Sequence, residues 1–285
     1  MALNPQSAIR NPHFPRRLIV NADDFGRSAS INAAVIRAYR EGILTTASLM
    51  VNELGCPEAV ALAKENPRLG IGLHLTLLMG DSALPPKRIP GLANARGEFS
   101  DSPVGAGMKY FLKRSLREQL RAEIHAQFKK FRATGLPLDH VNGHLHFHLH
   151  PVVFGILVED AAQLGLTHLR LTREPFWLDA PLARGNRFYR ASHAVIFSCL
   201  SWAAQARLRA RRIKHTARVF GLLQNARVDE AYVSKLLPLL PPGDSELYSH
   251  PSLDEFKNEF DALVSPRVKE LVAQQKIQLI RYRDL

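Results

Sequence analysis

The sequence predicts a single-domain α/β fold, a distorted (β/α) barrel of the TIM type with seven or eight mostly parallel strands. Two observations lead to this prediction. Short apolar runs alternate with helical patterns along almost the whole chain, and such alternation is typical of parallel βα units. The length of 285 residues and the hydrophobic content of 46% are sufficient for one large core. An open doubly wound sheet is the alternative.

The first third of the chain follows this alternation. Residues 17–24 (RLIVNADD) predict a strand that ends in two carboxylates, and residues 28–42 predict a helix that stops at Gly42. The next predicted elements are a β-branched strand (44–51), a short helix between prolines (57–67) and a strand (69–78). Residues 79–107 are rich in Gly and Pro and predict a long surface loop.

The clearest helix is predicted for residues 115–135, where large apolar side chains fall on one stripe. This stripe consists of Leu116, Leu120, Ile124, Phe128 and Phe131. Ser115 and Glu118 form a capping-box signature at the start of the helix. The later elements are a strand (138–142), a helix with Pro151 in its first turn (151–165), a strand (167–172), a helix (228–240), a strand (245–250), a helix (266–275) and a strand (277–282).

The net charge of +12 is concentrated in one segment, because residues 180–228 contain ten Lys or Arg and no Asp or Glu. We predict a basic and apolar insertion in the domain at about residues 176–226. Within it, residues 191–218 combine an apolar stretch with a basic one, which suits a helix on an anionic membrane with Trp202 near the interface. The alternative is a core helix followed by a solvated basic helix. Because the charge is local, we expect no nucleic-acid partner.

The N-terminal residues and the cysteines indicate where in the cell we expect the protein. Residues 1–16 contain no apolar core, so we expect an N-terminal tail before a domain at 17–285, and neither a signal peptide nor a transmembrane span. Cys56 and Cys199 make no disulfide framework, which fits a reducing compartment. We therefore expect a cytoplasmic protein, peripheral on the inner membrane face if the basic segment binds lipid. Nothing in the sequence indicates the oligomeric state.

Polar residues follow four of the predicted strands at their carboxyl ends. They are Asp23 and Asp24, His74, His144 and His250. In either α/β fold these strand ends meet at one edge. A helix cap, a core histidine or a turn residue explains each cluster taken alone, but four such coincidences together are improbable. The sequence therefore predicts an active site at this edge.

The densest cluster is the stretch LDHVNGHLHFHLHP at residues 138–151, with five of the twelve histidines. In an extended chain His144, His146 and His148 point to one side, and only the nearest one or two reach a single metal ion. The others are then free to contact the ligands or the substrate. The run therefore predicts a contribution to a metal site rather than a complete site.

A carboxylate with two imidazoles leaves coordination positions open and suits Zn, Mn, Fe or Mg. Such a site makes water more acidic and polarises a carbonyl group. A second, non-ligating carboxylate beside it can act as a general base, and Asp23 and Asp24 supply one acid for each role. His250 is placed to protonate a leaving group. The sequence therefore predicts metal-assisted hydrolysis of an amide or ester.

Four motifs in this order resemble the YdjC-like carbohydrate deacetylase family, which includes the chitooligosaccharide deacetylases. They are NADDFG (21–26), GLHLT (72–76), GHLHFHLHP (143–151) and ELYSHP (246–251). The resemblance extends over about residues 17–282. The histidine run is most similar to the hopanoid-biosynthesis-associated branch, HpnK.

The resemblance implies roles for single residues and one divalent metal ion, Mg or Zn. It implies that Asp24, His74 and His144 bind the ion, that Asp23 is the general base and that His250 is the acid. His146, His148, Asn142 and Arg170 become candidates for contacts with the ligands or the substrate. Many members have Asp where this chain has Asn142, which can orient a neighbour but cannot act as a carboxylate. Arg170 either contacts an acetyl or sugar oxygen or forms an ordinary salt bridge.

The resemblance also implies a substrate, an N-acetylglucosamine joined to a hopanoid lipid, with a chitooligosaccharide as the alternative. Carboxylates and histidines also serve metal-dependent phosphoesterases, which often use two metal ions. A non-enzymatic module that binds an anionic surface is a third alternative, but it leaves the converging acids and histidines unexplained.

Overall fold

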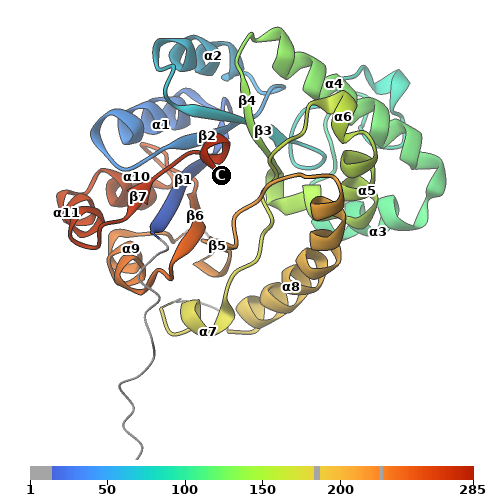
Figure 1. Cartoon of the computed structure of the whole chain (residues 1–285). Helices are drawn as coiled ribbons and strands as arrows, with labels where there is room; N and C mark the ends of the chain where they lie inside the picture. Colours follow the sequence, from blue (N-terminus) through green and yellow to red (C-terminus); the bar gives the residue numbers. More distant parts are fainter. Residues whose placement is uncertain (1–14, 183–186, 225–226) are drawn as a thin grey trace, which may run out of the picture.

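The computed structural model describes residues 15–182, 187–224 and 227–285, and its strands lie inside a ring of helices (Figure 1). The strands pair in the order β4–β3–β2–β1–β6–β5, all parallel, and β7 pairs with β1. Their bounds are β1 (Arg16–Phe25), β2 (Thr46–Leu49), β3 (Gly70–Leu75), β4 (Leu138–Gly143), β5 (Arg218–Phe220), β6 (Gly243–Ser249) and β7 (Gln278–Leu279). The predicted N-terminal tail lies outside the described residues up to residue 14.

Residues 168–173 close the sheet into a barrel. On one side, the backbone N–H of Val141 donates to His168 and that of Arg170 donates to Val141, both at 3.0 Å. On the other side, the N–H of Val219 donates to the carbonyl of Arg173, also at 3.0 Å. The strand expected at 167–172 is therefore present as isolated bridges to β4 and to Lys214 rather than as a regular strand. The prediction of a parallel (β/α) barrel is confirmed.

The helices cover the outside of the sheet (Figure 1). Their bounds are α1 (Ala29–Glu41), α2 (Cys56–Glu65), α3 (Pro103–Leu112), α4 (Arg117–Ala133), α5 (Pro151–Glu159), α6 (Ala161–Leu164), α7 (Phe176–Asp179), α8 (Arg187–Ala210), α9 (Glu230–Leu236), α10 (Lys257–Val264) and α11 (Pro266–Gln274). Short 3-10 helices are η1 (Pro86–Arg88), η2 (Arg114–Leu116), η3 (His144–Leu149), η4 (Leu222–Gln224), η5 (Leu237–Leu239) and η6 (Tyr282–Asp284).

Along each strand, side chains alternate between two environments. Leu18 and Val20 of β1 belong to the hydrophobic core under the helices. Asn21 and Asp23 point the other way, into the barrel, where the Asn21 amide donates to Asp23 and to Ser48 of β2. Barrel interiors are usually filled by Val, Ile and Leu. The polar interior of this barrel therefore supports a site rather than packing alone.

The C-terminal residues close the amino-terminal end of the barrel. Tyr282 of η6 stacks on the His140 ring, with 4.4 Å between ring centroids. The Arg283 guanidinium donates to Asp139 near the start of β4, at 2.9 Å. Gly72 of β3 leaves room for the His140 ring, because a Cβ there would lie 2.5 Å from it. Asp139, His140 and Tyr282 are thereby buried at this end of the barrel.

Three local predictions are wrong or incomplete. Residues 103–112, expected in a loop, form α3, whose first turn is capped by the Ser102 hydroxyl. The expected capping box does not form, because the helix cap is Leu116 and the Glu118 carboxylate accepts from Arg121 instead. Helix α10 was not predicted. The five-residue apolar stripe of α4 is buried as expected.

The predicted insertion contains α7 and α8, and its residues 183–186 and 225–226 lie outside the described residues. One face of α8 is buried and includes Ala194, Ser201 and Leu208. The opposite face exposes Val195 and Trp202, the latter to 81%. Helix α8 is therefore an outer layer of the domain whose solvent face is still apolar. Among the described helices, none combines the length and apolar character needed to cross a membrane.

Candidate metal centre

Asp24, His74 and His144 lie together at the carboxyl ends of β1, β3 and β4. One ligand atom of each lies within 4.8 Å of the others, and all three residues are buried. The Asp24 Oδ1 atom is 3.2 Å from His74 Nε2 and 3.1 Å from His144 Nδ1. One carboxylate and two imidazoles with this spacing can hold a single divalent ion and leave positions open. Among the described residues, no second group of this kind is found.

The backbone and Arg27 fix the direction of Asp24. Asp24 adopts a left-handed φ of 63°, a conformation that costs a non-glycine residue about 1 kcal/mol. Its carbonyl accepts from the Arg27 N–H at 3.0 Å, and the Arg27 guanidinium donates to Oδ2 at 2.9 Å. Oδ1 is left facing both histidines. Burial alone raises the pKa of Asp24, but the His144 and His74 imidazoles beside it hold that pKa well below its usual 3.8.

Asn142 selects the ring nitrogen that His74 presents to a metal ion. The Asn142 side-chain oxygen accepts from His74 Nδ1 at 2.7 Å, while its amide group donates to Asp23 and to Ser48, both at 2.9 Å. The proton of His74 therefore sits on Nδ1, and Nε2 is buried with no hydrogen-bond partner among the described residues. A buried, unpaired imidazole nitrogen aimed at a carboxylate is the donor that a divalent metal ion requires. The residues present therefore fit such an ion.

Asp23 is ionised and tightly held by Arg170. The Arg170 guanidinium donates to both Asp23 oxygens, at 2.6 and 3.0 Å, and also to Glu246 of β6 at 2.7 Å. Burial raises the pKa of Asp23, but the charge and hydrogen bonds of Arg170 together with the charges of His74 and His250 hold this pKa below 3.8. Asp23 Oδ2 has one hydrogen-bond partner, so it retains capacity to accept a proton. Of the two alternatives for Arg170, the structure shows the salt bridge.

His250 follows β6 and is held by Glu259 of α10. The Glu259 carboxylate accepts from the His250 backbone N–H at 2.6 Å and lies 3.8 Å from His250 Nδ1. Burial lowers the pKa of His250, but Glu259 and the charge of Asp24 raise it to about 9. The imidazole is therefore protonated at neutral pH, as a general acid must be.

The histidine run is not extended, so this expectation is wrong. Residues 144–149 form η3, in which Leu145 and His146 have left-handed φ angles of 48° and 58°. His146 therefore turns away from the metal group and its Nε2 contacts the Tyr248 hydroxyl at 2.9 Å. His148 Nε2 donates to the Arg170 carbonyl at 3.0 Å. Burial, with the charge of Arg170, lowers the pKa of His148 to about 3, so this ring is neutral.

Several residues at the site were missed by the sequence reasoning. Glu246 and Tyr248 lie on the inner face of β6, and Tyr248 packs its ring under the Arg170 guanidinium at 4.4 Å. Buried parallel strands read as nearly continuous apolar runs, so a glutamate inside SELYSH was the available signal. Arg27 and Glu259 had no such signal, because their roles depend on a turn and on a helix that the sequence did not predict.

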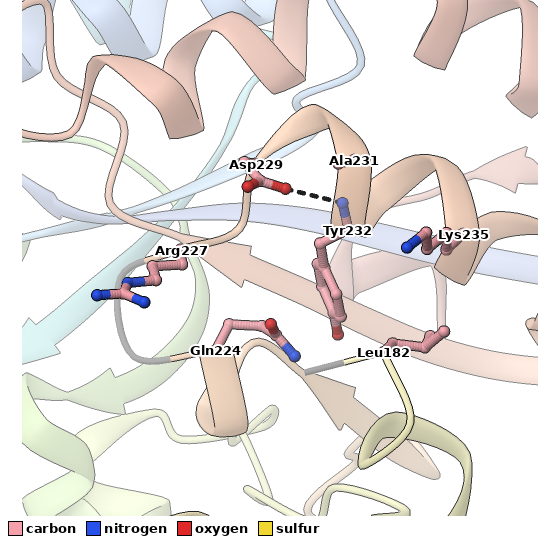
Figure 2. A pocket seen from close by; sticks show the side chains of 7 residues that line it. All are labelled: Leu182, Gln224, Arg227, Asp229, Ala231, Tyr232 and Lys235. Atoms are coloured by element: carbon pink, nitrogen blue, oxygen red, sulfur yellow. Dashed lines mark hydrogen bonds between the residues drawn. The ribbon is translucent and has the colours of Figure 1, made fainter. Parts of the chain in front are cut away.

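Two hollows lie outside the metal group. The first, between η4 and α9, has a volume of about 20 Å³, near that of a single water probe, and is too small for a sugar (Figure 2). Figure 2 also shows Asp229 at the start of α9, where its carboxylate accepts from the Tyr232 N–H at 2.8 Å. The second hollow is open, measures about 750 Å³ and follows β3, from Met79 to Lys109 of α3.

The fold and this centre define a parallel (β/α) barrel with a carboxylate and two histidines at its catalytic edge. The family model described as YdjC-like protein matches residues 17–274, and the chain belongs to this family. The resemblance to this family is therefore confirmed, and the HpnK branch stays a prediction.

Individual relatives agree with this assignment. A chitooligosaccharide deacetylase of Serratia marcescens is 31% identical over 94% of this chain and 98% of its own length. A carbohydrate deacetylase of Brevibacillus brevis is 40% identical, but the match covers 52% of this chain and 56% of the relative. The chain likewise spans little more than half the length of the next two curated relatives. A solved structure from Enterococcus faecalis, described as a cellobiose-phosphate cleavage protein, has the same fold, with a TM-score of 0.74, 21% identity and coverage of 95% and 98%.

Proposed function

We propose that this protein is a metal-dependent hydrolase that removes the N-acetyl group from an N-acetylglucosamine-type sugar. The observation that carries the proposal is the group Asp24, His74 and His144 beside an ionised Asp23 and a protonated His250. The names of the relatives, carbohydrate and chitooligosaccharide deacetylases, support the same reaction class.

Each residue has a task in this reaction. One divalent ion, Mg or Zn, held by Asp24, His74 and His144 would polarise the acetyl carbonyl and lower the pKa of water in the site. Asp23 accepts a proton through Oδ2 as water adds to the carbonyl carbon. His250 donates a proton to the nitrogen as the C–N bond breaks, so that acetate and a free amine leave. Arg170 keeps Asp23 ionised, and Asn142 keeps His74 in the tautomer that exposes Nε2.

For the group that carries the sugar, we propose an apolar lipid such as a hopanoid, in a cytoplasmic protein at the inner membrane face. The exposed Leu145, beside the metal-binding His144, supports an apolar neighbour of the sugar. The predicted membrane contact of residues 191–218 stays a prediction. A chitooligosaccharide is the second candidate, favoured by the open hollow after β3. Its volume is within the usual range for ligand sites, and Asn94, Arg96 and Glu98 line it.

The Asp23→Asn variant tests the assignment of the base. We expect acetate release to fall by about 10²–10⁴-fold, while the metal ion still binds and Arg170 keeps its pair with Glu246. The measurement is acetate release from an N-acetylglucosaminyl lipid and from chitobiose, with metal content and melting temperature measured alongside. Asp261→Asn, which removes only an exposed pair with Lys257, is the matched control.

Unchanged acetate release in Asp23→Asn would contradict the base assignment. Two metal ions per chain, with phosphate ester cleavage and no acetate release, would instead favour a phosphoesterase.

A further inference from the structure

Large exposed apolar side chains gather at the catalytic end of the barrel. We define the apolar rim as Val104, Met108, Phe111, Leu112, Leu145 and Trp177, which are between 47% and 89% exposed. The rim residues follow the carboxyl ends of β3, of β4 and of the closing segment at 168–173. Since all these strands are parallel, the three connections surround the mouth of the same site.

Four residues of the rim form one face of α3. Val104, Met108, Phe111 and Leu112 are spaced as i, i+4, i+7 and i+8, which places them on one side of a helix. Two contacts hold the helix to the site, because Gly107 of α3 accepts from His150 Nε2 at 3.1 Å and Tyr110 packs against Phe147. Helix α3 is therefore anchored at the end of η3 while its apolar face points to solvent.

The remaining residues of the apolar rim, Leu145 and Trp177, extend it to other parts of the barrel opening. Leu145 directly follows His144, the proposed metal ligand, in the sequence. Trp177 contacts Phe176, which packs in the same apolar cluster as Tyr248 of the site. Helices α3 and α7 occupy different positions around the barrel (Figure 1). A broad surface that touches both therefore covers the mouth.

The other large exposed apolar side chains lie on different elements. Among the described residues, Leu54 follows β2, Leu239 precedes β6, and Phe188, Val195, Ile196 and Trp202 lie on α8. Single exposed apolar residues are normal, whereas a contiguous patch marks a binding surface.

The charge around α3 indicates the partner. From Ser102 to Leu116 there is no acidic residue, while Lys109, Lys113 and Arg114 are exposed and have no described ion pair. An apolar helix face next to unpaired cations is typical of helices that lie on anionic lipid. The segment predicted to bind the membrane, residues 191–218, has its basic end at a different place on the barrel. Lys214 pairs with Thr167 at the start of the closing segment, so residues 209–214 lie at the far end of the barrel.

We propose that the apolar rim docks on an anionic phospholipid bilayer, so that the metal site faces the lipid surface. A sugar that projects from a lipid then enters the site without leaving the membrane. The substrate part of this inference rests on the proposed deacetylase function, but the docking does not require catalysis.

Co-sedimentation with vesicles of phosphatidylcholine and phosphatidylserine in equal parts tests the docking. We expect the wild-type protein to bind, and the double variant Phe111→Ser/Leu112→Ser to bind at least about tenfold more weakly, because two apolar side chains no longer enter the lipid. Leu239→Ser is the matched control for an exposed leucine, and Arg211→Gln/Arg212→Gln is the control for charge at the far end. Neither control should change binding.

Three outcomes would overturn the docking proposal: no vesicle binding by the wild type, loss of binding only in the Arg211/Arg212 variant, or self-association that the Phe111/Leu112 variant abolishes. Acetate release from soluble chitobiose separates this from the proposed function. The Phe111→Ser/Leu112→Ser variant should keep that activity in full. Absence of acetate release by the wild type would count against the deacetylase reaction alone.

Discussion

Asn142 connects His74 to Asp23, the proposed general base, through single hydrogen bonds. It accepts from His74 and donates to Asp23, so a carboxylate in its place would face Asp23 with no proton between them. An Asp at this position would therefore have to share a proton with Asp23 or move away from it. In this chain the amide lets Asp23 stay ionised while His74 Nε2 stays available. The uncharged side chain of Asn142 thus fits the hydrogen-bond network between His74 and Asp23.

The pair of His250 and Glu259 predicts the alkaline limb of the pH profile. His250 has a pKa of about 9, so a reaction that needs its proton declines as pH rises through that value. In Glu259→Gln the opposing charge is lost, and we expect the alkaline limb of kcat/KM to move down by about 1 pH unit or more. The amide still accepts one of the two N–H groups that Glu259 holds, from His250 and Val228.

Glu255→Gln, an exposed change just before α10, is the control and should leave the profile in place. An alkaline limb that does not move in Glu259→Gln would show that His250 is not the titrating acid. The free energy of unfolding should also fall as pH rises. Because folding raises the pKa of His250, its stabilising contribution is present below about pH 6.5 and is lost as pH rises through about 9.

Among the helices and strands, those with clear apolar periodicity were predicted from the sequence. Strand β1 and helix α1 lie within one or two residues of their expected bounds, because an apolar strand and a Ser28 cap mark them. Periodicity could not predict η3, where two left-handed residues turn the histidine run away from an extended path. Helix α3 was missed because Gly and Pro within it resemble a loop. The gathering of Asp24, His74 and His144 was nevertheless predicted, because it depends only on which strands end together, whereas their role as ligands was implied by the family resemblance.

Gly72 of β3 tests how tightly the barrel interior is packed. A Cβ at this position would lie 2.5 Å from the His140 ring, which is itself fixed by Ser48 and by the stacked Tyr282. We expect Gly72→Ala to lower the free energy of unfolding by about 1–3 kcal/mol, measured by urea denaturation.

Gly155→Ala in α5 is the matched control, because its Cβ would have no neighbour closer than 3.9 Å. This control should be neutral or stabilising by up to about 1 kcal/mol, as alanine favours a helix. Equal effects of the two substitutions would show that His140 moves freely.

At the scale of the molecule, the centre joins parts of the sheet that are distant in sequence. Asp24, His74 and His144 come from β1, from β3 and from the end of β4. Arg170, on the closing segment, joins Asp23 to Glu246 across the interior. This network could not be predicted from the sequence, because it exists only once residues 168–173 close the barrel. Asp24, His74 and His144 therefore connect β1, β3 and the end of β4. The Arg170 ion pairs connect the closing segment with β1 and β6.

A bound metal ion should for this reason stabilise the whole domain. With free ion at 100 times its dissociation constant, we expect about 2.7 kcal/mol of added stability. At about 2–4 °C per kcal/mol for a domain of this size, the melting temperature should rise by about 5–10 °C. Chelation with EDTA should reverse the rise. His74→Gln should abolish it, since Gln lacks the imidazole Nε2, while His125→Gln, in a partly exposed pair with Asp160, should keep it. An equal rise in His74→Gln would place the ion elsewhere among the twelve histidines and contradict the centre described above.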